Sequence, residues 1–236
     1  MLGWPLASMI RSRPADVGET VDGLPPVTKD SGQAEAPTGP AFTARQALRT
    51  SAFWMLSLGH GFSLLVVMAI NVHAITHIKE GLGYSLSQAS LFFTLVTFGQ
   101  FLGVMLGWLL GEKFVKRKVA ATCLLMHAAG LLLLTYAPGP VILAFALLLH
   151  GVAWGLRGPF MQAIRADYFG RRSIGVILGL STMVTVIGNI VGPVMAGAFA
   201  DAYGNYRLGF TILALLAGAG SLFFLLAKPP KIPNPT

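Results

Sequence analysis

Arg157 is the residue of this 236-residue chain best placed to do chemistry, because it is the one charge set well inside a long apolar segment. It stands eight residues, or roughly 12 Å of helix, before the basic residue Arg165. His150, Trp154, Arg157 and Met161 share one helical face, since each follows its predecessor by three or four positions. A cation inside an apolar helix is costly and usually faces a partner or a cavity.

Two interpretations of Arg157 stay open. No Asp or Glu lies inside an apolar segment to neutralise it, so an anionic ligand is one source of the missing charge, and a guanidinium binds carboxylates well. Alternatively, the side chain snorkels to the near membrane surface or caps carbonyls freed by Gly158-Pro159. Under the first interpretation the candidate substrate-binding residues are Arg157, Trp154, His150, His60, Asn71, Gln100, Thr185 and Asn189.

Most polar residues inside apolar helices simply hydrogen-bond neighbouring helices. This is the plainer interpretation of five of the candidates, His60, Asn71, Gln100, Thr185 and Asn189. His73, His77 and Glu80 have a spacing that could hold a metal, but a surface histidine pair is the favoured interpretation, and we predict no metal site. Gly179–Thr182 begins like a serine-hydrolase turn but lacks its closing glycine. We therefore expect no catalytic residues, no cofactor and no enzyme activity.

Glycine is patterned as well as abundant. Gly99, Gly103, Gly107 and Gly111 recur every four residues, and a second apolar segment carries Gly188, Gly192 and Ala196. Small residues at this spacing let another helix approach closely. We assign the first four to helix packing, either as a static contact or as an interface that slides.

The elements that must position these residues are membrane-spanning helices. Hydrophobic residues make up 54% of the chain and charged residues 11%, too little charge for a soluble domain, which has about 25%. Alternating ten-residue segments typical of a transmembrane barrel are absent from the sequence. We expect an all-α, six-helix bundle in the lipid bilayer, with spans at Phe53–Ile78, Leu86–Leu110, Val119–Ala137, Val141–Arg165, Ile174–Ala200 and Leu208–Ala227.

The remaining segments divide the chain further. Residues 1–10 are an interfacial stub or the end of a preceding helix, and the proline-rich residues 11–42 read as a disordered cytoplasmic linker. Residues 43–50 form an interfacial helix that opens with a capping box at Thr43 and Gln46. The six-helix domain covers 51–228 and a cytoplasmic tail covers 229–236. Gly158-Pro159 and Gly192-Pro193 are expected to kink their helices.

The net charge of +8 does not indicate nucleic-acid binding, because the basic residues gather at helix ends and in the linker. They set the orientation instead, with both termini cytoplasmic, and we place the chain in the plasma (inner) membrane. Of the basic residues outside the spans, only Lys79 and Arg207 fall on the side opposite the cytoplasm. The fourteen assigned to the cytoplasmic side are Arg11, Arg13, Lys29, Arg45, Arg49, Lys113, Lys116, Arg117, Lys118, Arg165, Arg171, Arg172, Lys228 and Lys231.

Four stretches together resemble the major facilitator superfamily, in its monocarboxylate and oxalate–formate exchanger-like branch. They are the linker motif Arg13–Asp16, the helix entry Ala47–Trp54, the loop Asp167–Ser173 and the outer turn Asp201–Arg207. The stretch Gly107–Arg117 departs from that family's loop pattern, with shifted spacing and Val115 at a glycine position.

The resemblance implies the second half of a twelve-helix secondary transporter that works by alternating access, with residues 1–10 ending its sixth helix. It implies a small organic anion as substrate, with a monocarboxylate as the favoured kind, and protons or an exchanged anion as the coupling partner. The partner of this half would be a missing N-terminal six-helix half or a second copy of the chain. The alternative is a truncated or non-transporting six-helix protein that serves as a scaffold or partner subunit.

Overall fold

The six apolar segments are helices in the computed structural model, which describes residues 40, 42–111, 113–171 and 173–232. The stub predicted at 1–10, almost all of the linker predicted at 11–42 and the last four residues of the tail lie outside this description. Across the described ranges, all regular secondary structure is helical, and six helices are long and apolar enough to cross a membrane. The prediction of an all-α protein with six spans is confirmed.

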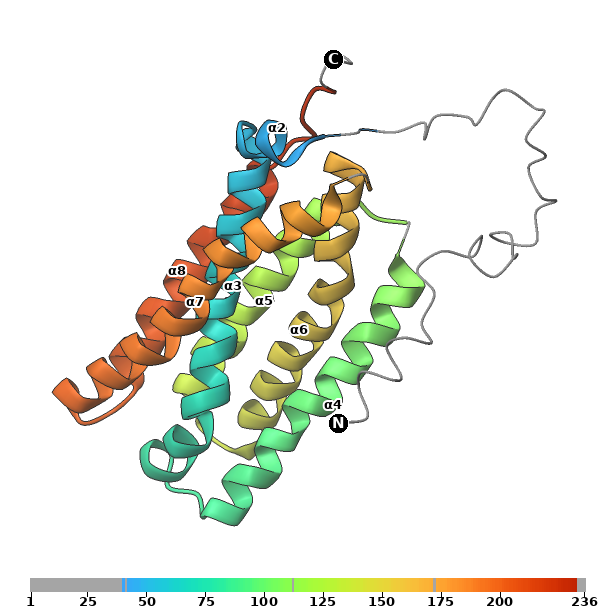
Figure 1. Cartoon of the computed structure of the whole chain (residues 1–236). Coiled ribbons are helices and arrows are strands. Elements are labelled where there is room, and N and C mark those ends of the chain that lie inside the picture. The colour runs from blue at the N-terminus through green and yellow to red at the C-terminus, as the bar shows by residue number, and fades with distance from the viewer. Residues whose placement is uncertain (1–39, 41, 112, 172, 233–236) are drawn as a thin grey trace, which may run out of the picture. The chain divides into compact units, whose positions relative to one another are not determined.

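The helix bounds lie within a few residues of those expected, except that two helices run further than predicted. The helix expected to end at Arg165 continues to Phe169, and the one expected to end at Ala200 continues to Tyr203. In chain order the elements are α2 (Ala44–Leu48), α3 (Ser51–Thr76), its π-helical continuation η3 (His77–Gly81), α4 (Leu86–Leu110), α5 (Lys116–Thr135), α6 (Pro140–Phe169), α7 (Ile174–Tyr203) and α8 (Arg207–Leu226) (Figure 1).

Local chemistry explains where several helices begin and end. The predicted capping box is present at α2, where the Thr43 amide donates to Gln46 Oε1 over 2.8 Å and the Gln46 amide donates to Thr43 Oγ1 over 3.3 Å. α6 starts at Pro140, whose missing N–H costs nothing in a first turn. α6 and α7 stop at Gly170 and Gly204, whose positive φ angles of 75° and 70° favour glycine.

The two internal prolines do not divide their helices. α6 remains one helix through Pro159 and α7 remains one helix through Pro193, so the interruptions expected there do not create separate elements.

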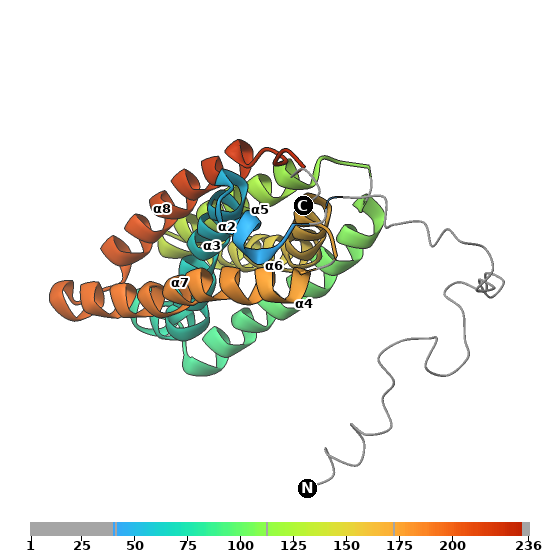
Figure 2. The same cartoon turned by 45° about the horizontal axis from the view of Figure 1, so that its top comes forward.

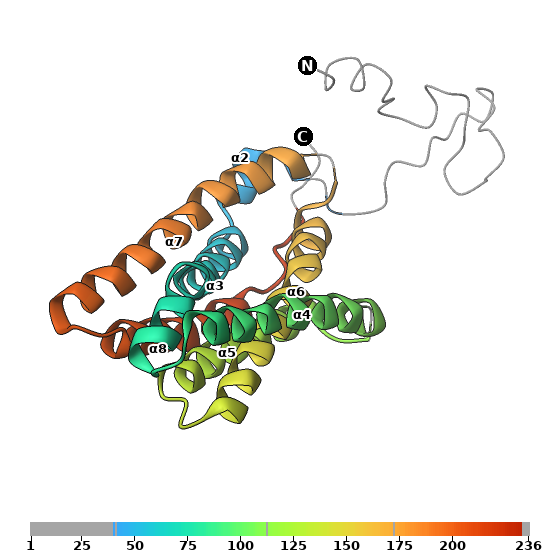
Figure 3. The ribbon, with the colours of Figure 1, turned by 90° about the horizontal axis from the view of Figure 1, so that it is seen from below.

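The helices pack in a connected series within the bundle. α4 lies against α6, α6 against α5, α5 against α8, α8 against α3 and α3 against α7. Figure 2 shows α7 and α4 crossing in front of the inner helices, and Figure 3 shows α7 apart from α4, along one edge of the bundle. These two helices are also the least buried of the six, so each presents a broad face outward.

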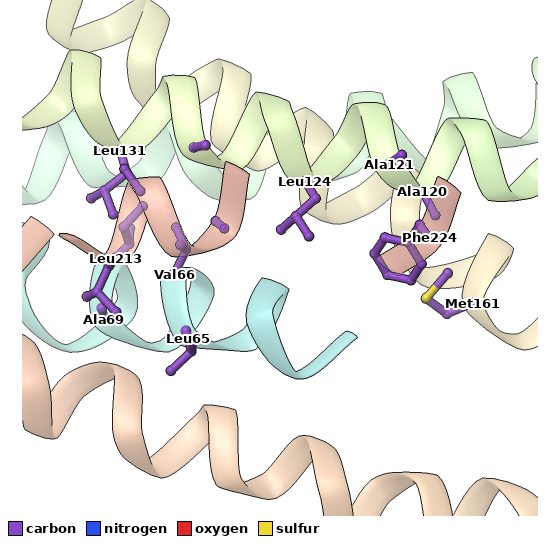
Figure 4. Packing of buried hydrophobic residues seen from close by; sticks show 14 of the residues in the cluster. Leu65, Val66, Ala69, Ala120, Ala121, Leu124, Leu131, Met161, Leu213 and Phe224 are labelled. Carbon is purple, nitrogen blue, oxygen red and sulfur yellow. The ribbon is translucent and has the colours of Figure 1, made fainter. Parts of the chain in front are cut away.

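The apolar core joins α3, α5 and α8. Val66 and Ala69 of α3, Leu124 and Leu131 of α5 and Leu213 of α8 are buried together (Figure 4). Met161 extends this cluster onto α6, so the core reaches the helix that carries Arg157.

Glycines bring α4 close to α6. A Cβ atom built on Gly99 would lie 2.7 Å from the Leu148 carbonyl oxygen, and one on Gly103 would overlap the carbonyl oxygen of Val152. Gly107 has ordinary contacts with the Leu156 side chain, at 3.6 Å. Gly111, expected to belong to the same run, caps the end of α4 and meets only carbonyls of its own helix, because the helix ends there. The packing run is therefore three glycines long.

The second run lies between α3 and α7. Side chains at Gly188 and Gly192 would overlap the carbonyl oxygens of Gly61 and Leu65, so these two helix backbones touch. Near the start of α7, Gly179 has no neighbouring atom within 4 Å of a built Cβ, so it takes no part in this contact.

Candidate functional site

Arg157 lies inside the protein. Only 2% of the residue is exposed, and neither Nε nor Nη1 has a hydrogen-bond partner among the described residues. A side chain that snorkelled out would expose its head group, and one that capped carbonyls would have partners for these donors. The structure shows a buried guanidinium with at least two unused donor atoms.

No described carboxylate can neutralise this charge from within the bundle. In the described part of the chain the acids are Glu80, Asp167 and Asp201, which lie in η3 and near the ends of α6 and α7. Asp167 already pairs with Lys116, with Nζ 2.6 Å from Oδ2. A buried cation without a counter-charge is expensive, so the position favours an anion supplied from outside the described chain.

Arg165 is a second buried cation, which the sequence analysis took as the last residue of its span and counted with the basic residues of the cytoplasmic side. The helix does not end there, because α6 continues for four residues beyond Arg165, and the residue is only 3% exposed. Its Nη1 donates to the Met161 carbonyl over 3.0 Å, and its Nη2 donates to Ser181 Oγ over 2.7 Å and to His60 Nδ1 over 3.3 Å. Arg165 thus ties α6 to α7 and α3.

Ser181 shows why the serine of the Gly179–Thr182 stretch is not a nucleophile in this structure. Its Oγ accepts from Arg165 and lies 2.8 Å from Ser57 Oγ, and both serines are buried. A serine nucleophile needs an adjacent base, and the polar partners described for Ser181 are a cation and a hydroxyl.

His127 of α5 pairs with His150, which lies about two turns before Arg157 on the same face of α6. The two Nδ1 atoms are 3.0 Å apart, both residues are completely buried, and neither Nε2 atom has a described partner. Trp154, which is half-buried, lies beside this pair with its ring centroid 6.5 Å from that of His150. The sequence analysis named His150 and Trp154 but not His127, whose partner is 23 residues away.

The other predicted residues are spread over three helices. His60 joins the Arg165 contacts, and Thr185 is buried on α7 with its hydroxyl donating to the Thr182 carbonyl over 3.0 Å. Asn189 has a buried Oδ1 without a described partner. Asn71 and Gln100 are half-buried on α3 and α4. The structure therefore groups Trp154 and His150 with Arg157, and His60 with Arg165; no described hydrogen bond joins Asn71, Gln100, Thr185 or Asn189 to either arginine.

His73 and His77 are not the surface pair that their spacing suggested. His73 is half-buried, with Nδ1 3.1 Å from the Tyr206 hydroxyl and Nε2 3.0 Å from the Pro193 carbonyl oxygen. Burial, with further contributions from Glu80 and Asp201, raises the pKa of Tyr206, so its hydroxyl keeps its proton and can donate to His73.

His77 is completely buried, and its ring packs against the rings of Tyr206 and Phe210. In the described residues no cluster of three His, Cys, Asp or Glu side chains could hold a metal ion. The C-terminal end of α3 and η3 therefore meet α7 and α8 through aromatic and hydrogen-bonding contacts.

One hollow of about 500 Å³ lies at the predicted cytoplasmic end, away from Arg157. It opens between the start of α5 and the end of α6, and the Lys116–Asp167 ion pair forms part of its wall. Tyr168 also lines it and donates to the Ala227 carbonyl oxygen over 2.8 Å. This end of the bundle is thus held together by polar contacts among α5, α6 and the segment after α8.

Comparison with known proteins gives one consistent result. The family model of the Major Facilitator Superfamily matches residues 56–236. Monocarboxylate transporter 13 of Bos taurus is 28% identical over 173 residues, covering 69% of this chain and 40% of the relative. The benzoate transport protein of Acinetobacter baylyi is 25% identical over 210 residues, covering 88% of this chain and 44% of the relative.

Among solved structures, the fucose:proton symporter FucP of Escherichia coli shares the fold, with a TM-score of 0.67 and 22% identity over 78% of this chain and 44% of that one. The chain thus spans less than half the length of the relatives it matches.

Proposed function

This chain belongs to the major facilitator superfamily, and from that premise we propose that it forms half of a secondary transporter that moves a small organic anion by alternating access. One observation carries the choice of an anion. Arg157 is buried in the bundle with Nε and Nη1 unpartnered, and the described residues offer it no carboxylate. We assign to Arg157 the binding of the substrate's carboxylate.

Three further observations support a monocarboxylate rather than a dianion. Arg165, the other buried cation, already donates to three acceptors and is tied to neighbouring helices. Trp154, about one turn before Arg157 on α6, and the histidine rings near it suit an organic group better than a second charge. Two similar proteins are named for monocarboxylate and benzoate transport.

Alternating access requires a second bundle for this one to rock against. The outward faces of α4 and α7 are broad and apolar, and we propose that a preceding six-helix half or a second copy of the chain covers part of them. The glycine contacts of α4 with α6 and of α7 with α3 would then lie next to the moving interface.

The test is anion uptake into proteoliposomes by a twelve-helix protein that contains this chain, with radiolabelled benzoate and lactate as probes. Arg157→Gln is expected to lower uptake at least tenfold, since a hydrogen bond to a charged group contributes roughly 1.5–3 kcal/mol. Arg157→Lys keeps the charge but loses the planar fork, so partial uptake is expected.

The matched control is Arg207→Gln, which removes an exposed cation at the predicted outer end and should leave uptake near that of the parent. Amounts of folded protein are equalised by size-exclusion chromatography before reconstitution. Uptake by Arg157→Gln equal to the parent would remove Arg157 from the binding site.

A further inference from the structure

The His127–His150 pair, called the histidine pair below, contains a basic nitrogen that no described group uses. The two Nδ1 atoms lie 3.0 Å apart, so one of them carries a proton and the other accepts it. A neutral imidazole has a single N–H. The ring that donates through Nδ1 therefore has a free lone pair on Nε2, and neither Nε2 has a described partner.

The pair also lies within electrostatic reach of Arg157. His150 precedes Arg157 by seven residues, roughly 10 Å along α6, and a helical side chain leans back toward the N-terminus, here toward His150. A proton added to the pair is repelled by the uncompensated guanidinium. An anion bound to Arg157 cancels much of that repulsion.

Few other charges act on the pair. On its own two helices the titratable groups inside the bundle are Cys123, Arg157 and Arg165. α3 adds His60 and His73, and η3 adds the buried His77. α4 carries no charged or titratable side chain. The charged residues of α7 and α8 in the described ranges are Asp201 and Arg207, near the predicted outer ends of these helices.

We infer that His127 and His150 form a proton-binding site coupled to the anion at Arg157. This inference rests on the proposed function. The added proton goes to the free Nε2, the Nδ1–Nδ1 hydrogen bond is kept, and no covalent bond other than N–H forms. Because linkage is reciprocal, the bound anion increases the proton affinity of the pair by the same factor by which the proton increases the affinity for the anion.

The size of that factor follows from the separation. One charge roughly 10 Å away in a medium of effective dielectric constant about 20 changes a binding constant about tenfold. Benzoate affinity should therefore rise about tenfold as the pH falls through the range in which the pair takes up its proton.

The experiment measures equilibrium binding of radiolabelled benzoate to the full chain, within the twelve-helix protein in nanodiscs, between about pH 4.5 and about pH 8, because burial and the guanidinium both disfavour the charged form of the pair. Affinity is calculated for the benzoate anion alone, so that protonation of benzoate at the acidic end is not counted as a change in binding. The parent should bind about tenfold more tightly at the acidic end. The double variant His127→Asn/His150→Asn keeps a hydrogen bond at the Nδ1 positions but cannot titrate, so its affinity should not change with pH.

The control is His77→Asn, which removes another completely buried histidine, in η3, and should keep the pH dependence of the parent. A pair that only joins α5 to α6 predicts a different result, with lower stability in the double variant and no pH dependence in the parent. If the affinity for benzoate still depends on pH in the double variant, the assignment of the proton to the histidine pair is overturned.

A second readout distinguishes failure of this inference from failure of the proposed function. If the parent binds no benzoate at any pH, the protonation of isotope-labelled histidines is followed by NMR in the parent and in Arg157→Gln. Removal of the guanidinium should let the pair hold its proton to a pH about one unit higher. The same titration in both proteins would overturn the inference whatever the substrate is.

Discussion

Two buried arginines on α6 differ in what their donors meet. Arg165 is bonded to one carbonyl, one hydroxyl and one imidazole on three helices, whereas Nε and Nη1 of Arg157 have no described partner. A guanidinium whose donors are satisfied holds structure together, and one whose donors are free is available to a ligand. This difference, rather than charge or burial, is what separates the two residues.

The contact at Ser181 predicts a measurable loss of stability. Ser181→Ala removes the partner of Ser57 and the nearer of the two acceptors of Arg165 Nη2, so one N–H of the buried guanidinium loses its hydrogen bond. The expected cost is about 1–3 kcal/mol of unfolding free energy, measured by SDS titration in mixed micelles. Thr182→Ala, at an exposed hydroxyl that bonds only to its own helix, is the control and should change little.

A second substitution tests the cause of that loss. In the double variant Ser181→Ala/Arg165→Gln the guanidinium is absent, so the cost should be smaller than the sum of the two single substitutions. Additive costs would show that Arg165 and Ser181 are not energetically coupled.

For single residues, the sequence predicts that Arg157 is unusual but does not predict which residues surround it. Arg157 stands out because a charge inside an apolar run is costly and needs a partner, a cavity or a route to the membrane surface. Arg165 is hidden, since a basic residue near a helix end looks like a topology signal, and only the absence of a helix breaker before Gly170 hints that the helix continues. His127 has no signal at all, because its partner is set by how α5 packs on α6.

At the scale of elements, backbone contact decides where glycine matters. A Cβ on Gly103 would overlap the Val152 carbonyl oxygen and lie 2.7 Å from the Leu156 amide nitrogen, both of which belong to the rigid backbone of α6. The neighbouring helix can respond only by moving away as a whole. A shared four-residue spacing does not reveal this, since Gly111 has the same spacing and no such contact.

Gly103→Ala should therefore destabilise the protein by about 1–3 kcal/mol, the usual cost of overpacking. Gly179→Ala is the matched control, because a methyl group there meets no atom within 4 Å and alanine favours helix by up to about 1 kcal/mol. The measurement is the thermal unfolding midpoint in detergent. Equal midpoints for the two variants would mean that α4 does not depend on this close approach.

Elements are the part of the structure that the sequence predicts best. A span of lipid thickness needs about 20 apolar residues, and the chain presents six such runs separated by glycine, proline and charge. The ends are less certain from sequence because a helix can extend past the apolar run when its polar residues find partners. α6 does so through Arg165 and through Asp167, which pairs with Lys116.

For the whole molecule, orientation depends on basic residues at the ends of helices. Arg165 leaves that count because it is buried, so thirteen of the fourteen assigned to the cytoplasmic side remain against two on the other side. Part of that set, including Arg11 and Arg13, lies outside the described residues. Lys113, Lys116, Arg117, Lys118 and Arg171 lie in or beside the turns that join α4 to α5 and α6 to α7, both at the same end of the bundle.

Labelling from each side of the membrane tests this orientation directly. The background carries Cys123→Ser, which removes the one native cysteine, itself completely buried. Ser173→Cys, between α6 and α7, should react with an impermeant maleimide only after the cells are opened, and Asn205→Cys, between α7 and α8, should react in intact cells. The two sites serve as each other's control, since they flank the same helix and one span separates them.

The orientation depends on the whole set of basic residues, so loss of one of them should not invert the bundle. The reverse pattern would place Arg157 nearer the outer surface than the inner one, and anion entry would then have to be reconsidered from that side.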